Sequence, residues 1–379
     1  MIPSDIARIQ PRAWKLLSRA VENDRVAGTY LFYGPPKVGH WPLAVSFAAL
    51  LNCETRPRPA TDEGLPIPCG ECFACRNIFG LNFEGFLVAL PLAPHKKADE
   101  GIDLANAILE EKREEPFRPI RWSGNDMIRI ETAREVRRQL STRAPGGMTR
   151  VALFHHMEKM RLQSADALLK MIEEPPSDTV IILTTERPES LLPTIQSRSQ
   201  MIRLERSDPA IVASYLESNL EVEPDKAAHL ARLAEGSLGA AVELAAQRED
   251  DDSSRRAVGH LLFKSLFLDS KAETVSLAAT MVNQRDRAQF VELLNLWQSL
   301  IADCSRYSIS GDEAGIINSD FQADIVKLSS RFNGSHPARS MSSAIKIALD
   351  DMALNVHILG SLSALVLRLK SAIEAEPAL

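Results

Sequence analysis

Residues 151–184 read VALFHHMEKMRLQSADALLKMIEEPPSDTVIILT, and this stretch decides the fold. The apolar runs at its two ends, 151–154 and 180–184, have the composition and length of buried strands. The segment between them repeats apolar residues at helical spacing: Leu162, Ala165, Leu168, Leu169 and Ile172. Pro175 and Pro176 end this helix because proline cannot continue the hydrogen-bonded ladder. A strand, a helix and a second strand in this order predict a βαβ unit in a parallel sheet.

Two further strands are predicted before and after this unit in the sequence, at Thr29–Tyr33 and Met201–Leu204. Strands that alternate with helices predict an α/β domain, with a mostly parallel sheet covered by helices, over residues 1–206. Strand patterns then disappear, and Asp208-Pro209 is typical of a helix cap followed by proline at the first helical position. We therefore expect a small helical domain at 207–248, a polar acidic linker at 249–254, and an all-α domain at 255–379.

The composition is that of an ordinary soluble protein, with 379 residues, 45% hydrophobic residues, 25% charged residues and a net charge of −6. The negative charge argues against a protein that coats nucleic acid by itself. The N-terminal sequence MIPSDIARIQPRAW interrupts any apolar core with charges and a proline, so we expect a cytoplasmic protein without a secretory signal. The longest apolar runs are shorter than the roughly 20 residues of a membrane-spanning helix, and no span is expected.

The sequence LFYGPPKVGHW, residues 31–41, follows a predicted strand and opens a helix. A phosphate-binding loop belongs at this place, with the form G-x-x-x-x-G-K-[ST], in which backbone amides hold the phosphates, the lysine neutralises charge and the hydroxyl holds magnesium. Gly34 and Gly39 have the required separation, but His40 and Trp41 replace the lysine and the hydroxyl. Lys37 lies inside the loop and not at the helix start. The sequence therefore predicts a degenerate Walker A motif.

The acidic strand end that ATPases use to hold magnesium is also changed. His155 and His156 follow the strand 151–154, and neither supplies a carboxylate. Because adjacent residues on a strand point to opposite faces, we expect an ordinary strand end here and no joint metal site.

Four cysteines, Cys53, Cys69, Cys72 and Cys75, follow the pattern C-x15-C-x2-C-x2-C in a loop rich in proline and glycine. Four thiolates at such spacing suit a tetrahedral structural zinc ion, and buried cysteines without a ligand are the alternative. Cys304 stands alone in a helical pattern, and we expect it in a core.

Two charged segments allow more than one interpretation. The charged stretch Pro94–Glu115 is predicted to be an insertion with one surface helix. Arginines gather between residues 129 and 150: Arg129, Arg134, Arg137, Arg138, Arg143 and Arg150. Such a cluster can bind a DNA backbone, but without interleaved aromatic residues a solvated helix face or a subunit contact is an equal alternative.

The run SADALLKMIEEPPSDTVIILTTERPESLLPTIQSRSQMIRL, Ser164–Leu204, resembles the bacterial clamp-loader family of DNA polymerase III. In that family a helix of the form ALLKxxEEPP precedes a strand and a closing S-R-C motif. The resemblance is greater to the delta-prime type than to the gamma/tau ATPase type, and it extends from about Gly28 to Gln247. It implies an AAA+ domain with a helical lid and a helical collar, and a part in loading the sliding clamp onto primed DNA with gamma/tau and delta subunits.

The resemblance also implies roles for single residues. Ser197-Arg198-Ser199 stands at the S-R-C motif, which implies that Arg198 acts as an arginine finger on ATP bound by a neighbouring subunit. A surface arginine paired with a carboxylate is the alternative. Gly239 stands where the family has a nucleotide-sensing arginine, and Thr185 matches the first sensor threonine. A similar four-cysteine module follows the family's phosphate loop, although its first gap is usually shorter.

These features together predict a clamp-loader subunit that has no ATPase activity of its own and binds no ATP. Two alternatives remain: a gamma/tau-like motor ATPase, and a zinc-bearing regulatory module outside replication. The missing loop lysine argues against the first, and co-purification with clamp-loader subunits would exclude the second.

Overall fold

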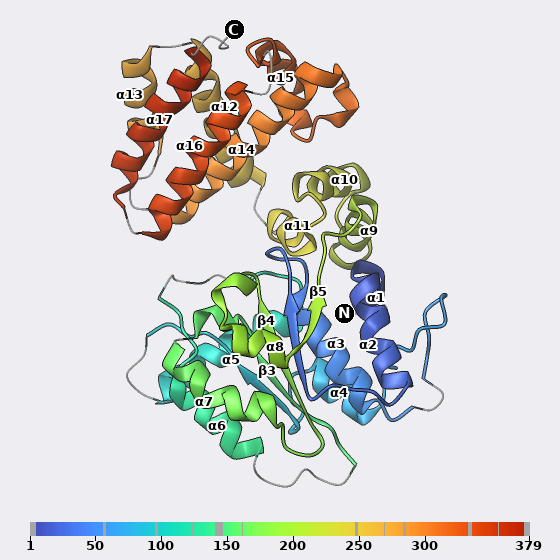
Figure 1. The fold of residues 1–379 in the computed structure, drawn as a ribbon. Coiled ribbons are helices and arrows are strands. Elements are labelled where there is room, and N and C mark those ends of the chain that lie inside the picture. Colours follow the sequence, from blue (N-terminus) through green and yellow to red (C-terminus); the bar gives the residue numbers. More distant parts are fainter. Residues whose placement is uncertain are drawn as a thin grey trace. The chain divides into compact units, whose positions relative to one another are not determined.

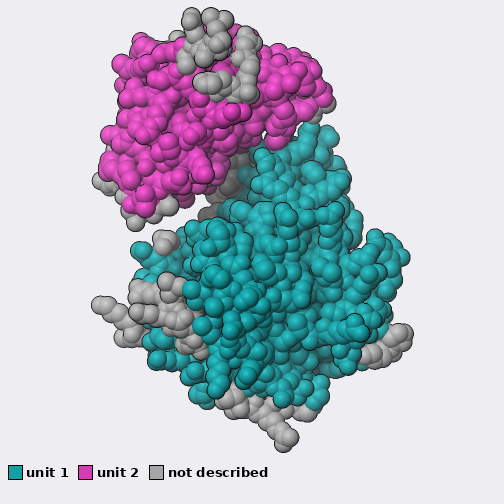
Figure 2. All heavy atoms as spheres, viewed as in Figure 1, with its two compact units in different colours: residues 1–246 teal, residues 247–379 magenta. Residues whose placement is uncertain are grey.

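The computed structural model describes residues 5–55, 58–94, 98–120, 122, 125–140, 147–160, 162–246, 249–268, 270–282, 286–332, 336–354 and 356–374. The chain forms two compact units, residues 1–246 and 247–379, which are coloured separately in Figure 2. Each unit is built around its own hydrophobic core.

A five-stranded sheet forms the centre of the first unit. Its strands are β1 (Thr29–Tyr33), β2 (Phe86–Ala89), β3 (Arg150–Phe154), β4 (Thr179–Thr185) and β5 (Gln200–Arg203). They lie in the order β2-β3-β4-β1-β5, and every neighbouring pair is parallel. The four strands predicted from the sequence are confirmed. β2 was not predicted from the sequence.

Helices cover both faces of this sheet (Figure 1). Those of the first unit are α1 (Asp5–Ile9), α2 (Pro11–Glu22), α3 (His40–Asn52), α4 (Phe73–Phe79), α5 (Ala98–Glu114), α6 (Ile130–Leu140), α7 (Leu162–Glu173), α8 (Pro193–Arg198), α9 (Pro209–Leu220), α10 (Pro224–Leu233) and α11 (Leu238–Ala245). Alternate strand residues face opposite layers. Tyr30 and Phe32 pack toward α2 and α3, while Leu31 packs toward α6 and α7.

Two helices of this unit position the site. α3 follows the phosphate-type loop, and its residues 40–50 are all buried, as expected of a helix that is apolar on every side. α9 begins where the sequence predicted, because the Asp208 side chain accepts a hydrogen bond from the Ala210 amide and caps the helix. α7 likewise ends at Glu173, before the two prolines.

The second unit is entirely helical in its described residues, and the predicted fold class is confirmed. Its helices are α12 (Glu249–Leu268), α13 (Lys271–Met281), α14 (Arg287–Ser310), α15 (Gln322–Ser329), α16 (His336–Ala353) and α17 (Ile358–Glu374). The acidic stretch 249–254, expected to be a linker, is instead the start of α12. The reason is that acidic residues favour the amino-terminal end of a helix, where they balance the helix dipole. Cys304 is buried in this core, as predicted.

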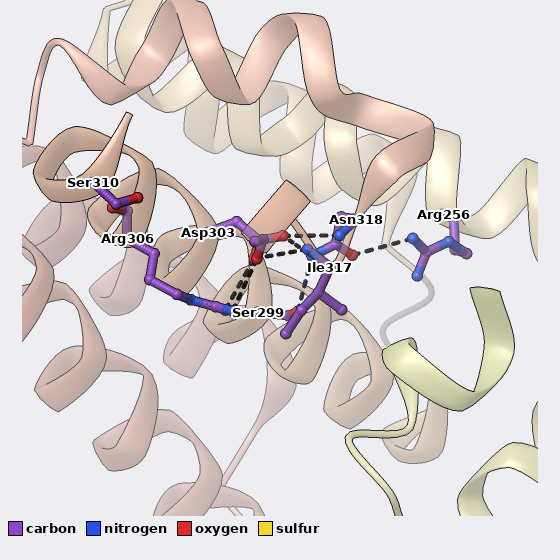
Figure 3. Close-up of polar contacts among 8 residues, drawn as sticks. Arg256, Ser299, Asp303, Arg306, Ser310, Ile317 and Asn318 are labelled. Atoms are coloured by element: carbon purple, nitrogen blue, oxygen red, sulfur yellow. Dashed lines mark hydrogen bonds and ion pairs between the residues drawn. The ribbon is translucent and has the colours of Figure 1, made fainter. Parts of the chain in front are cut away.

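One buried carboxylate organises a long connection in the second unit (Figure 3). Asp303 is fully buried on α14 and accepts hydrogen bonds from the backbone amides of Ile317 and Asn318, at 3.1 and 2.8 Å. Arg306 and the Asn318 side chain also donate to it, at 3.0 and 2.7 Å. A buried carboxylate with this many donors is stabilised as an anion, so it fixes residues 317–318 against the helix.

Candidate functional site

The loop at residues 34–39 connects β1 to α3, as a phosphate-binding loop does. Gly39 has φ of 107° at the N-cap of α3, a conformation that favours glycine. A Cβ atom on Gly34 would lie 2.4 Å from the Leu204 carbonyl oxygen, so this position also requires glycine. The backbone scaffold of the loop is therefore present, and His40 is the first residue of the helix that follows it.

The helices α9–α11 contact this loop directly. The Ser237 hydroxyl donates to the carbonyl oxygens of Pro36 and Lys37, both at 3.2 Å. The Gly239 amide donates to the Lys37 carbonyl at 2.9 Å. A Cβ atom on Gly239 would lie 2.7 Å from that same oxygen and 2.8 Å from the carbonyl oxygen of Phe117. The position expected to hold a nucleotide-sensing arginine in relatives therefore has no space for any side chain.

The segment after α5 fills the space between the loop and these helices. The Phe117 side chain is 3% exposed and packs edge-on against the Tyr215 ring, with centroids 5.1 Å apart. A Cβ atom on Gly39 would lie 3.1 Å from the Phe117 ring. The Tyr215 hydroxyl donates to the Glu115 carboxylate at 3.1 Å. An aromatic side chain thus stands where the loop would otherwise open toward α9.

Lys112, on α5, holds this segment in place. It is 6% exposed, and its ammonium group donates to the carbonyl oxygens of Pro116 and Arg118, at 3.1 and 2.5 Å. The same group lies 5.7 Å from the centre of the Trp41 ring, within range of a cation–π interaction. Burial lowers the pKa of Lys112 to about 7. The stretch Pro94–Glu115 does hold the predicted helix, but its charges do not all lie on a solvated face.

A small cavity of about 110 Å³ remains beside the loop. Its lining residues come from the loop, the start of α3, the segment after α5 and the ends of β3 and β4: Lys37, Gly39, His40, Trp41, Pro42, Lys112, Pro116, Phe117, Pro119, Ile120, Trp122, His155, His156 and Glu186. Binding sites for small organic ligands usually have volumes of about 300–1,000 Å³. The cavity is therefore too small for a nucleotide in this conformation.

The two histidines after β3 lie on the same side of the chain, which corrects the sequence-based expectation of opposite faces. Their ring centroids are 4.3 Å apart. β3 ends at Phe154, and His156 has φ of 61°, so the alternation of a strand does not continue through it. Thr184 contacts both residues: its hydroxyl lies 2.8 Å from His155 Nδ1 and accepts from the His156 amide at 3.0 Å.

Burial keeps two of the histidines at this site neutral. Burial, and then the charge of His156, lower the pKa of His40 to about 3. The pKa of His155 is well below its usual value, first because the ring is buried and then because positive charge on His156 and Lys112 disfavours its protonation. Neutral imidazole is the form that binds metals.

Two carboxylates lie close to His156. The Oε1 atom of Glu158 is 2.9 Å from His156 Nδ1. Burial raises the pKa of Glu158, but hydrogen bonds from His156 and Thr185 and the charge of His156 outweigh it and lower the pKa to about 2. Glu186 follows β4 and accepts a hydrogen bond from the Lys37 amide at 3.1 Å. The ligand atoms of His156, Glu158 and Glu186 all lie within 4.8 Å of one another.

Sequence reasoning missed this group because it assumed a regular strand through His156. The signal was present in the spacing H-x-E at 156–158. Lys37 is also engaged elsewhere: its ammonium group pairs with Glu243 of α11 at 2.5 Å, so it does not stand in for the missing loop lysine in this conformation.

Arg198 is the last residue of α8, and its side chain is 40% exposed. Its guanidinium pairs with Glu173 at the end of α7 and donates to the Thr194 carbonyl at 3.3 Å. The Ser199 hydroxyl, at the position of the family's cysteine, donates to the Ile195 carbonyl at 2.8 Å. The guanidinium is accessible at the surface of the unit, with a carboxylate partner.

The four clustered cysteines converge at the end of α3 and the start of α4. The sulfur atoms of Cys53, Cys69, Cys72 and Cys75 all lie within 4.8 Å of one another, and those of Cys69 and Cys75 are 3.9 Å apart. Four backbone amides point at these sulfurs: Cys69 N to Cys53 at 3.4 Å, Glu71 N and Cys72 N to Cys69 at 3.4 and 3.2 Å, and Cys75 N to Cys72 at 3.4 Å. Burial raises the pKa of Cys69, but hydrogen bonds from Thr55, Cys72 and Glu71 lower it to about 6.

Only some of the arginines predicted to form a cluster lie on the same helix. Arg134, Arg137 and Arg138 lie on α6. Arg150 is instead buried in β3, where it donates to the Gln139 carbonyl and to the Thr179 hydroxyl, both at 3.3 Å. Arg143 lies outside the described residues.

Across the described helices, none has both the length and the apolar character needed to cross a membrane.

Comparison with known proteins agrees with the family suggested by the sequence. The family model described as "DNA polymerase III, delta subunit" matches residues 9–208. DNA polymerase III subunit delta′ of Bacillus subtilis is 28% identical over 256 residues, which cover 67% of this chain and 64% of that protein. The delta′ subunit of Pseudomonas aeruginosa is 31% identical over 195 residues, or 52% of this chain and 47% of that protein.

Subunits of the tau type are also similar. DNA polymerase III subunit tau of Escherichia coli is 29% identical over 254 residues, which cover 65% of this chain and 33% of that protein. A solved gamma subunit-related protein of Thermotoga maritima aligns over 95% of this chain and 99% of its own, with a TM-score of 0.46 and 16% identity. The chain spans about half to two thirds of the length of the two delta′ relatives. Because the family model matches more than half of its residues, the chain belongs to the DNA polymerase III delta subunit family of clamp-loader proteins.

Proposed function

We propose that this chain is a delta-prime-like clamp-loader subunit that binds no ATP, hydrolyses none, and helps load the sliding clamp onto primed DNA. Its partners are subunits of the gamma/tau and delta types, and it acts in the cytoplasm. The observation that carries the proposal is the contact of Gly239 and Phe117 with the loop at 34–39, which leaves a cavity of about 110 Å³. The sequence adds the loss of the loop lysine and hydroxyl at His40 and Trp41.

The proposal also gives Arg198 a role in a neighbouring subunit. An arginine finger stabilises the charge that develops on the transferred phosphoryl group, and it can be supplied in trans. The 40% exposure of the Arg198 side chain makes it accessible to a partner. Its pairing with Glu173 does not oppose this role, because exposed ion pairs contribute about 0–1 kcal/mol and are readily exchanged.

The four-cysteine group is proposed to bind a structural zinc ion. A tetrahedral zinc ion with Zn–S bonds of about 2.3 Å has sulfur–sulfur edges of about 3.8 Å, close to the 3.9 Å between Cys69 and Cys75. The amides that point at the sulfurs would stabilise thiolate charge. Cys53, Cys69, Cys72 and Cys75 would hold the ion and connect α3 to the start of α4. With four protein ligands the ion has no open position for catalysis.

Calorimetric titration of the isolated chain with Mg·ATP tests the central proposal. We expect no binding at micromolar concentrations, because neither the cavity nor the loop side chains accommodate the nucleotide. A gamma/tau subunit titrated in parallel is the positive control. Binding of Mg·ATP in the micromolar range would contradict the proposal and favour the motor ATPase alternative. Purification with gamma/tau and delta subunits as a stable assembly tests the partner assignment separately.

A further inference from the structure

Three side chains of types that can bind a metal ion converge beside the phosphate-type loop. They are His156, Glu158 and Glu186, and their ligand atoms all lie within 4.8 Å of one another. A tetrahedral zinc ion with bonds of about 2.1 Å has ligand–ligand edges of about 3.4 Å. Side-chain rotations that bring these atoms closer by at most about 1.4 Å would therefore complete the site.

Two polar atoms near this group are buried without a hydrogen-bond partner. The Glu158 side chain is 3% exposed, and its Oε2 atom has no partner. His40 is 5% exposed, its Nε2 atom has no partner, and it lines the same cavity as His156 and Glu186. A buried polar atom without a partner is destabilising. The His40 atom is therefore suited to a further hydrogen bond in the cavity, and the Glu158 atom, although that residue does not line the cavity, is suited to a ligand bound by the three side chains.

The charges at the group also favour a cation. Glu158 and Glu186 bring two negative charges close together, where they repel each other, although His156 lies 2.9 Å from Glu158 and offsets part of that charge. The nearby lysine ammonium groups have other partners. Lys37 pairs with Glu243, Lys112 donates to the carbonyls of Pro116 and Arg118, and Lys159 lies over the Trp122 ring. A bound divalent cation would remove the repulsion.

We propose that His156, Glu158 and Glu186 form a second metal site, which binds one divalent transition-metal ion, with Zn²⁺ as the expected ion. One imidazole nitrogen and two carboxylate oxygens suit zinc, whereas magnesium prefers oxygen ligands alone. The cavity of about 110 Å³ has space for the ion and bound water. His40 lines the same cavity, and its Nε2 atom without a partner could form a hydrogen bond with such a water. The site is independent of the four cysteines and needs no nucleotide.

Zinc content after equilibrium dialysis of the full chain is the first test. The variants are Glu158→Gln/Glu186→Gln and, as a milder change at a partly exposed position, Glu186→Gln alone. Glu189→Gln, an exposed carboxylate three residues further along, is the matched control. We expect the unmodified chain and Glu189→Gln to hold about one equivalent of zinc more than the double variant. The difference is independent of how much zinc the cysteines hold.

Titration with Co²⁺ is the second test, and it locates the ion. Trp122 lies with its ring centroid 5.2 Å from that of His156, so bound Co²⁺ should quench its fluorescence. Quenching should weaken in Trp122→Phe and not disappear, because Trp41 lines the same cavity. It should persist in Cys72→Ser. In Glu186→Gln it should require at least about tenfold more Co²⁺, because loss of even an outer-shell partner weakens metal binding by about 10–100-fold. Equal zinc content in all variants, or quenching that follows only the cysteines, would overturn the second site. Neither outcome bears on whether the chain binds ATP.

Discussion

At the scale of single residues, Gly239 decides how α11 meets the loop. Its amide donates to the Lys37 carbonyl, and a Cβ atom there would lie 2.7 and 2.8 Å from two backbone carbonyl oxygens. Backbone atoms cannot turn away as the end of a flexible side chain can. Any larger residue at 239 must therefore push α11 away from the loop.

We expect Gly239→Ala to lower the free energy of unfolding by about 1–3 kcal/mol, the usual cost of overpacking a tight contact. Gly360→Ala is the control, because Gly360 also lies in a helix but has nothing within 4 Å of an added Cβ atom. That change should be neutral or stabilise by up to about 1 kcal/mol, since alanine is the better helix former. Urea unfolding of both variants measures the difference, and equal effects would show that the contact at Gly239 is not tight.

Arg198→Ala should leave the chain folded and the assembly intact while weakening ATP hydrolysis at one neighbouring site. Arginine fingers contribute about 10³–10⁵ in rate, so that single site should lose almost all activity. Total ATPase activity of the reconstituted loader should fall only by the share of this interface, while clamp loading falls severely. Arg198→Lys should also fail, because lysine lacks the planar fork of the guanidinium.

Two further variants make the Arg198 test specific. Arg203→Ala removes an exposed arginine from neighbouring β5 and should have no effect. Glu173→Gln removes the ion-pair partner and should leave ATPase activity intact, because the finger needs no carboxylate to reach phosphate. If the Arg198→Ala chain assembles and the reconstituted loader that contains it hydrolyses ATP at the unmodified rate, Arg198 is an ordinary surface residue.

At the scale of secondary-structure elements, the cysteine group connects the end of α3 to α4. Cys53 is the C-cap of α3 and Cys72 is the N-cap of α4. A ligand that binds only the folded state stabilises it by about 4 kcal/mol when its free concentration is a thousand times its Kd. Zinc bound by these cysteines would therefore stabilise this part of the first unit.

We expect freshly purified protein to contain zinc that depends on the cysteines. Cys72→Ser should lose about one equivalent and lower the melting temperature of the first unit, and chelation should do the same to the unmodified chain. Cys304→Ser, which changes a cysteine in the other core, should keep the zinc. Less than half an equivalent of cysteine-dependent zinc in the unmodified chain would refute the proposal.

Much of this architecture could be predicted from the sequence because it depends on local periodicity. The apolar runs gave four of the strands, and Asp208-Pro209 gave the start of α9. The cavity could not be predicted in the same way. It depends on Phe117, which is far from the loop in sequence and meets it only through α5. The left-handed backbone at His156 has no sequence signature, and it is what brings the two histidines together.

At the scale of the whole molecule, each of the two units has its own core, so each should unfold in its own transition. Differential scanning calorimetry should resolve the two, and mutations should move them separately. Asp303→Ala removes a buried acceptor of four donors in the second unit and should cost about 3–5 kcal/mol there. Cys72→Ser should shift only the transition of the first unit. A single transition that both variants shift equally would show that the units unfold together.

The hydrogen bond from the Lys37 amide to the Glu186 carboxylate bears on how this protein responds to the energy state of the cell. In a phosphate-binding loop the backbone amides hold an exchangeable anion, so the occupancy of the loop depends on the supply of nucleotide. Here the anion is part of the same chain. A ligand shifts a conformational equilibrium only by its difference in affinity for the two states, and this loop has no exchangeable anion to lose. The shape of the first unit should therefore stay constant while cellular ATP rises and falls.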